Sequence, residues 1–193
     1  MKNIFAELRP ALSLFILLTV VTGALYPLLI TAIGQAAFRN QANGSLIEST
    51  GKVVGSRLIG QPFTEERYFW SRPSATSAMP YNAASSSGAN LGPTNPALID
   101  AIKPRIAALK AADPANAAAI PVDLVTTSAS GLDPHISAAA AYYQLERVAR
   151  ARQLPAAKVR ALLESRLESP LLWFIGSPQV NVLEINLALD ALT

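Results

Sequence analysis

The chain has 193 residues, with 16 basic side chains, 13 acidic side chains, one histidine and no cysteine. These counts exclude a disulfide scaffold, thiol catalysis and zinc sites built from thiolates or several histidines, so we predict no metal site. Three of the basic residues and one acidic residue flank an N-terminal apolar stretch, and the remaining +1 charge gives no reason to expect a nucleic-acid partner.

An uncharged stretch runs from Pro10 to Phe38, 29 positions between two arginines. As a helix it would be about 44 Å long at ~1.5 Å per residue, whereas a bilayer core requires about 20 apolar residues. We therefore predict a transmembrane helix at 10–38. A cleaved signal peptide is the alternative, because small residues surround Gly34, but signal apolar regions run only about 7–15 residues.

Basic residues at both ends of this stretch predict its orientation. Lys2 and Arg9 lie on the short N-terminal side, and Arg39 lies on the side of the long domain. The positive-inside rule then predicts a short cytoplasmic N-terminus at 1–9 and an extracytoplasmic soluble domain at 39–193, in a single-pass protein of the inner membrane.

Proline and small residues interrupt the apolar stretch. Pro27 removes a helical hydrogen bond and favours a kink, which a neighbouring helix can cover. Thr22, Gly23 and Gly34 are small enough for close approach of another helix. We expect these four residues to pack against partner helices; the alternative is a solitary anchor.

The first part of the soluble domain is poor in periodic patterns. Residues 40–51 predict a polar loop, and Lys52 to Gly60 predicts a strand-like run cut by Gly55. Residues 71–95 are rich in Ser, Ala, Gly, Pro and Asn and predict a long loop, which is either functional or a disordered linker.

Helices dominate the second part. Asn95 as N-cap and a proline after it predict a helix to about Ala112, kinked at Pro104. Residues 121–125 then predict a short strand. The turn that follows contains Gly131, which can adopt a positive φ.

Two further helices and a strand complete the pattern. Ser137 caps a predicted helix to about Arg152, and Pro155 begins another. This pair carries a basic surface that predicts a solvated face or a contact with lipid headgroups or an acidic partner: Arg147, Arg150, Arg152, Lys158, Arg160 and Arg166. Alternation at 180–185 predicts a half-buried strand, and Asn186 a cap for the last helix.

Helices and short strands mix without strict βα alternation. The predicted class is therefore α+β: one N-terminal transmembrane helix followed by a single mixed α/β soluble domain.

Motifs for self-sufficient catalysis are missing from the sequence. It contains no phosphate-binding G-x-x-x-x-G-K-[ST] loop, no G-x-G-x-x-G and no G-x-S-x-G elbow. A nucleophilic triad of Ser128 or Ser130 with Asp133 and His135 would be crowded into eight residues, whereas triad members usually converge from distant segments. We therefore predict no catalytic residues, and a hydrolase is the third interpretation.

A series of blocks spans the chain in order and resembles the C-subunit family of the bacterial Kdp potassium-transporting ATPase: QANGSL (41–46), GSRLIGQPF (55–63), RPSA (72–75), SGANLGPTNP (87–96), PVDLVTTSASGLDPHIS (121–137), QLERVARAR (144–152) and VNVLEINLALD (180–190). The resemblance implies a non-catalytic accessory subunit of a high-affinity, ATP-driven potassium import complex, with the ATPase subunit, the channel-like subunit and membrane lipid as partners.

The resemblance also implies a catalytic chaperone that raises the ATP affinity of the ATPase subunit. ATP is implied by the resemblance alone. By their positions in the matching blocks, the nucleotide-related candidates are Gln144 and three residues of a turn, Ser130, Gly131 and Asp133. Because the predicted orientation places the domain across the membrane from ATP, we expect an allosteric or structural effect. The alternative function is a membrane-anchored extracytoplasmic ligand-binding module that uses loop 71–95.

Overall fold

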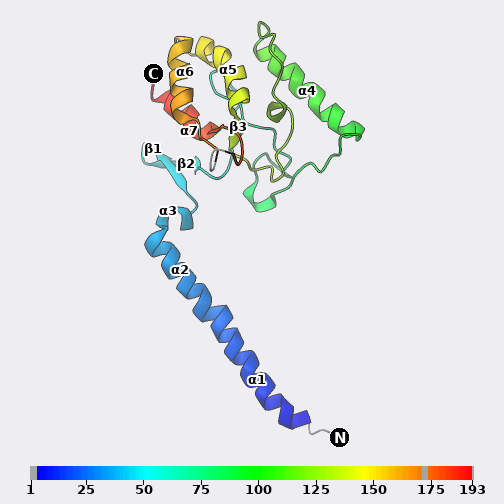
Figure 1. The fold of residues 1–193 in the computed structure, drawn as a ribbon, viewed down its shortest axis with the longest axis vertical. Helices are drawn as coiled ribbons and strands as arrows, with labels where there is room; N and C mark the ends of the chain where they lie inside the picture. Colours follow the sequence, from blue (N-terminus) through cyan, green and yellow to red (C-terminus); the bar gives the residue numbers. More distant parts are fainter. Residues whose placement is uncertain (1–3, 171–173, 193) are drawn as a thin grey trace. The chain divides into compact units, whose positions relative to one another are not determined.

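The computed structural model describes residues 4–170 and 174–192, and its internal contacts divide the chain into two units, Met1–Leu46 and Ile47–Thr193. One long apolar helix precedes a domain of helices and two small two-stranded sheets, so the predicted α+β class is confirmed (Figure 1). Each unit is described separately below.

The N-terminal unit is a nearly continuous helix with one wider turn. Helix α1 (Ile4–Val20) leads through a π-helical turn, Val21–Leu25, into α2 (Tyr26–Ala37) and the short α3 (Arg39–Ala42). The π-helical turn is closed by a hydrogen bond from Tyr26 N to Val21 O. It lies directly before Pro27, whose ring would clash with the carbonyl four residues earlier in a regular helix. The predicted interruption at Pro27 therefore takes the form of a π-helical turn.

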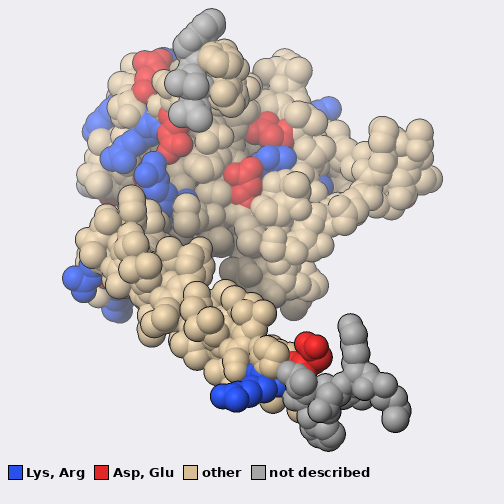
Figure 2. All heavy atoms as spheres, turned by 60° about the horizontal axis from the view of Figure 1, so that its bottom comes forward, with Lys and Arg blue, Asp and Glu red and all other residues tan. Residues whose placement is uncertain are grey.

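This helix has the length and composition of a membrane anchor. The run Glu7–Ala37 has 31 residues, an 18-residue stretch within it has a mean hydropathy of 2.2, and none of its residues is buried within the chain. Figure 2 shows the body of the helix without charged groups, which appear only towards its ends. An exposed apolar surface of this length is stable in lipid rather than in water.

The soluble domain begins with a hairpin that the sequence analysis missed. Strand β1 (Leu46–Ser49) pairs with β2 (Lys52–Ser56), and the two turn residues Thr50 and Gly51 both have positive φ, 51° and 76°. Such two-residue turns match the right-handed twist of a hairpin. The predicted loop at 40–51 is therefore wrong at 40–42, which belong to α3, and at Leu46–Ser49, which form β1.

The predicted long loop at 71–95 is confirmed, since its only regular element is the 3₁₀ turn η2 (Ala83–Ser85). Helix α4 (Pro96–Ala112) follows, with the Asn95 side chain accepting a hydrogen bond from Ala97 N as predicted. The predicted strand at 121–125 is wrong, because these residues form the 3₁₀ turn η3 (Val122–Leu124).

The second sheet and the last three helices form the centre of the domain. Strand β3 (His135–Ser137) pairs antiparallel with β4 (Gln179–Asn181), with Ile136 opposite Val180. Helices α5 (Ala138–Ala151), α6 (Ala156–Arg166) and α7 (Val182–Asp190) complete it. Ser137 caps α5 as predicted, accepting from Ala140 N at 3.0 Å.

The start of α7 corrects two predictions. The expected strand at 180–185 ends at Asn181, and Asn181 rather than Asn186 caps the helix by accepting from Glu184 N at 3.2 Å. The apolar residues Val182, Ile185 and Leu189 also recur at helical spacing, and packing of that stripe on the core favours the helix.

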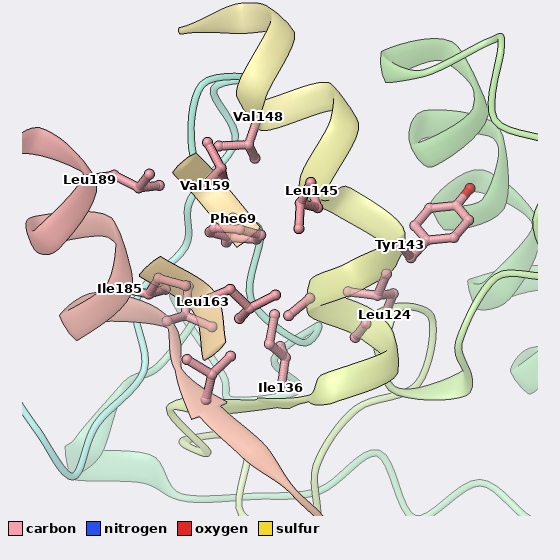
Figure 3. Close-up of a cluster of buried hydrophobic side chains, with 14 of the residues drawn as sticks. Phe69, Leu124, Ile136, Tyr143, Leu145, Val148, Val159, Leu163, Ile185 and Leu189 are labelled. Carbon is pink, nitrogen blue, oxygen red and sulfur yellow. The ribbon is translucent and has the colours of Figure 1, made fainter. Parts of the chain in front are cut away.

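The hydrophobic core lies between α5, α6, α7 and β3 (Figure 3). Its fully buried side chains include Phe69, Ile136, Leu145, Val148, Val159, Leu163, Ile185 and Leu189. Phe69 belongs to the irregular segment that precedes the long loop. Because Phe69 lies in the core, this segment passes through the centre of the domain. Helix α4 lies to one side, and its buried residue is Leu109, near its C-terminal end (Figure 1).

Candidate functional site

The turn that contains three of the predicted site residues has a backbone that requires glycine. Gly131 has φ of +69°, and a Cβ at this position would lie 2.6 Å from Ser87 O. Ser128 Oγ accepts a hydrogen bond from Gly131 N at 2.9 Å, and Ser130 Oγ accepts from Leu132 N at 3.1 Å. The predicted positive φ at Gly131 is therefore confirmed, and it allows loop and turn backbones to touch.

The long loop is bound to this turn by its own polar side chains. Ser74 Oγ donates to Gly131 O at 2.7 Å, and Ser130 O accepts from both Ser87 N and Ser86 Oγ at 3.0 Å. Tyr81 is buried and donates to Arg72 O, and burial raises the pKa of its phenol to about 12. These contacts make loop 71–95 part of the folded domain rather than a linker.

Charged side chains converge at the end of the turn. Asp133 pairs with Arg72, with 2.9 Å between Oδ2 and Nη1, and its Oδ1 accepts from His135 N at 3.0 Å. His135 lies between two carboxylates, with Nδ1 3.4 Å from Asp133 and Nε2 3.7 Å from Glu168. Arg57 extends the series by pairing with Glu168 at 2.8 Å.

A cleft of about 430 Å³ lies beside this charged cluster, and its polar lining includes Arg72, Asp123, Asp133, His135 and Ser137. Asp123 accepts from Ser137 N at 2.7 Å, so the outer edge of β3 is occupied by a carboxylate. Among the described residues, no hydrogen bond joins His135 to a serine, and no group of three or more His, Asp or Glu side chains could hold a metal ion. The geometry therefore does not support the triad that a hydrolase would need.

Gln144 lies apart from this cleft, in the interior of the domain. It is 1% exposed, and its amide makes four hydrogen bonds. Oε1 accepts from Trp70 N and from Arg147 Nη2, both at 2.7 Å, and Nε2 donates to Trp70 O and Ala140 O, both at 3.2 Å. An amide side chain has two N–H donors and one carbonyl acceptor, so its capacity is used within the chain. Its nucleotide-related role stays a prediction.

The segment 66–70 is held by side chains in place of a neighbouring strand, a feature that the sequence analysis missed. Asn186 accepts from Phe69 N at 2.9 Å and donates to Phe69 O at 3.0 Å, as Gln144 does for Trp70. Arg147 donates to Glu66 O and to Tyr68 O and lies over the Trp70 ring. The N–H and C=O groups of Phe69 and Trp70 thereby all find a partner.

The predicted solvated basic face of α5 and α6 is wrong for two arginines. Arg147 is 3% exposed, and burial lowers the pKa of its guanidinium to about 10. The Arg152 side chain is 4% exposed and pairs with Asp190. Arg147 lies seven residues after Ala140, on the same buried stripe of α5. This helical spacing is the signal in the sequence that could have predicted the burial of Arg147.

The predicted packing residues of the apolar helix lie on its surface. Thr22 Oγ1 donates to Leu18 O at 2.7 Å, so its hydroxyl is satisfied within the helix. A Cβ at Gly23 would meet nothing within 4 Å, and one at Gly34 would meet only Ala42. Contact of these residues and Pro27 with partner helices stays a prediction.

We expect acid to destabilise the domain through Asp133. Burial pushes the pKa of Asp133 up, but hydrogen bonds from His135 and the charge of Arg72 outweigh burial and lower this pKa. Because the folded pKa lies below the unfolded value of about 3.9, the stabilisation is complete above pH ~4 and is lost as pH falls through the folded pKa.

Thermal unfolding of the detergent-solubilised chain between pH 2.5 and 7 measures this loss. The variant Asp133→Asn should lose stability at neutral pH and show a flatter acid limb, whereas Asp100→Asn, on the surface of α4, should follow the parent curve. Parallel curves for the parent and Asp133→Asn would contradict the assignment.

Comparison with known proteins adds a second line of evidence. A family model described as "KdpC: K+-transporting ATPase, c chain" matches residues 8–191. A potassium-transporting ATPase KdpC subunit of Ralstonia nicotianae is 64% identical over 96% of this chain and 91% of its own length. Proteins with the same name from Polaromonas naphthalenivorans and Sorangium cellulosum are 63% and 61% identical, over 100% and 96% of the chain and 96% and 97% of their own lengths.

Proposed function

The chain belongs to the KdpC family, the c chains of K+-transporting ATPases, and from this membership we propose that it is a non-catalytic accessory subunit that stabilises a high-affinity potassium import complex and raises the ATP affinity of the ATPase subunit. The observation that carries the proposal is the match to KdpC subunits along almost the whole chain at more than 60% identity. A free-standing ligand-binding module is not favoured, because these relatives are named as subunits of a transport ATPase.

The ATP effect acts, in this proposal, through the conformation of the complex. Gln144 already makes four hydrogen bonds within the chain, which supports an indirect role over direct nucleotide contact. A subunit that binds one state of the ATPase more tightly shifts the complex towards that state and changes ATP affinity by the same coupling free energy. The ATPase and channel-like subunits are the proposed partners, and the exposed apolar helix is the part that meets lipid and partner helices.

Omission of the chain tests this function. We expect the detergent-purified complex without it to show a KM for ATP raised by roughly 5- to 150-fold, the usual range of coupling between sites, with recovery when the wild-type chain is added back. ATPase activity over a series of ATP concentrations measures the change. An unaltered KM for ATP, or failure of the chain to purify with larger subunits, would refute the proposal.

We further propose that the soluble domain lies outside the cytoplasm, as the basic residues near the N-terminus favour. Ala84→Cys introduces a single exposed thiol into a chain without cysteine. An impermeant thiol reagent should label it in cells whose inner membrane is intact. Protection in those cells, followed by labelling after lysis, would place the domain in the cytoplasm.

A further inference from the structure

A second cleft, of about 370 Å³, lies between the N-terminal half of α4 and two segments of irregular backbone. Leu91 belongs to the wall formed by the long loop, Leu98 and Ala101 to the wall formed by α4, and Thr127 and Ser128 to the third wall. The lining of this cleft is apolar apart from hydroxyls, the Asn90 amide and one charged side chain, Arg105.

Arg105 is a half-buried cation for which the described residues provide no counterion. Its Nη1 donates to Val125 O at 2.8 Å, and no carboxylate of residues 7–170 or 174–192 lies within ion-pair distance. Burial lowers the pKa of its guanidinium, and no nearby carboxylate offsets this effect. Arg57, Arg72 and Arg150, in contrast, each pair with a carboxylate at 2.6–2.9 Å. Arg147 is buried without an ion pair among the described residues, but it donates three hydrogen bonds to oxygens of the chain, whereas Arg105 donates one. Partly buried charges are normally paired.

The cleft is preformed, since its loop wall is fixed against the turn. Ser87 N donates to Ser130 O at 3.0 Å, and Gly88 lies so close to the turn that a Cβ there would be 2.7 Å from Ala129 O. The Asn95 cap fixes the start of α4 on the other side. A preformed pocket loses little entropy when a side chain enters.

The surface around the cleft is apolar and uncovered within the chain. Leu91 and Leu98 are half-buried, Ile99 is 52% exposed, and no residue in the N-terminal half of α4 is buried. A guanidinium without a carboxylate partner, set among exposed apolar residues, has the composition of the centre of an interface, where arginine is enriched and the surrounding contacts exclude water.

We propose that this cleft receives an aspartate or glutamate side chain from another subunit of the same complex, which pairs with Arg105 while apolar neighbours of that residue cover Leu91, Leu98 and Ile99. The inference rests on the proposed function, because it requires an assembled complex. One carboxylate neutralises the single charge of the cleft, and its two oxygens match the planar fork of a guanidinium. The Ser128 hydroxyl, which accepts from Gly131 N, has its proton available as a further donor.

The test is a site-specific cross-link in the purified complex. A photoreactive benzoylphenylalanine at Leu91 should cross-link to another subunit, and mass spectrometry should place the cross-linked peptide within a few residues of an Asp or Glu. Arg105→Glu and Arg105→Gln should lower the yield by roughly 10- to 100-fold, as loss of one partner of a buried charge pair does. Arg105→Gln keeps a donor for Val125 O, and melting temperatures of the variant chains confirm folding.

Lys103→Glu is the matched control, since it makes the same charge change on α4 at an exposed position, where the lysine pairs with Asp100. It should leave the yield unchanged. If the chain purifies with the complex but the cross-link forms only with lipid, lands far from any acidic residue, or persists in folded Arg105→Glu, the inference is wrong and the proposed function stands. If the chain does not purify with larger subunits, both are wrong.

Discussion

Replacement of Gln144 by alanine is expected to lower the free energy of unfolding of the chain by about 2–4 kcal/mol, because buried hydrogen-bonding groups lose their partner. Trp70 N, Trp70 O and one N–H of Arg147 would each lose a hydrogen bond in the interior. No water can replace the amide without entering a packed core. Denaturant unfolding of the detergent-solubilised chain measures the loss.

Two further variants separate this structural role from direct nucleotide contact. Glu146→Ala removes an exposed side chain from the same helix and should change stability by less than about 0.5 kcal/mol. Gln144→Glu keeps the acceptor for Arg147 but loses the donor to Trp70 O. Its loss of stability should therefore lie between those of Gln144→Ala and Glu146→Ala. If Gln144→Ala raised the KM for ATP in the complex while the chain kept its full stability, direct contact would be the better explanation.

Features set by neighbouring residues could be predicted from the sequence. The Asn95 and Ser137 caps and the positive φ of Gly131 depend on chemistry within three or four residues, and the structure confirms all three. The apolar helix could also be predicted, because a run of 29 uncharged, mostly apolar residues has few alternatives to a membrane-spanning helix.

Features that depend on contacts between distant residues could not be predicted from the sequence. Residues 121–125 have the composition of a strand, but the 3₁₀ turn allows Asp123 to accept from Ser137 N, 14 residues later. Asn186 is a residue type that often caps helices, but its side chain forms hydrogen bonds with the backbone of Phe69, 117 residues away. Single-sequence patterns carry no information about such pairs, and local preferences give way to packing.

The candidate cleft at Arg105 shows the same limit. Its three walls come from separate parts of the chain, and Arg105 itself is one of 16 basic residues with no distinguishing local pattern. What distinguishes it is that its guanidinium lines a cleft without a carboxylate partner among the described residues, and this placement is known only after folding.

Phe69→Ala is expected to be the most destabilising single substitution in the core, with a loss of about 3–5 kcal/mol. The side chain is 0% exposed and lies among the apolar residues of α5, α6 and α7 (Figure 3). The loss should approach the upper end of this range, because the cost of a cavity depends on how far its walls can relax. Here Asn186 holds the backbone of residue 69 and Gln144 that of residue 70, so the segment cannot move inward.

A double-mutant cycle tests that explanation. Asn186→Ala releases the backbone of Phe69, so Phe69→Ala should cost less in its presence, by roughly 0.5–3 kcal/mol. Leu58→Ala, at a side chain that is mostly exposed, serves as the control and should add to Asn186→Ala without coupling. Additive losses for Phe69→Ala and Asn186→Ala would mean that the cavity relaxes equally with and without the Asn186 contacts. Coupling would instead show that the two buried amides set the rigidity of the core at the point where the irregular segment crosses it.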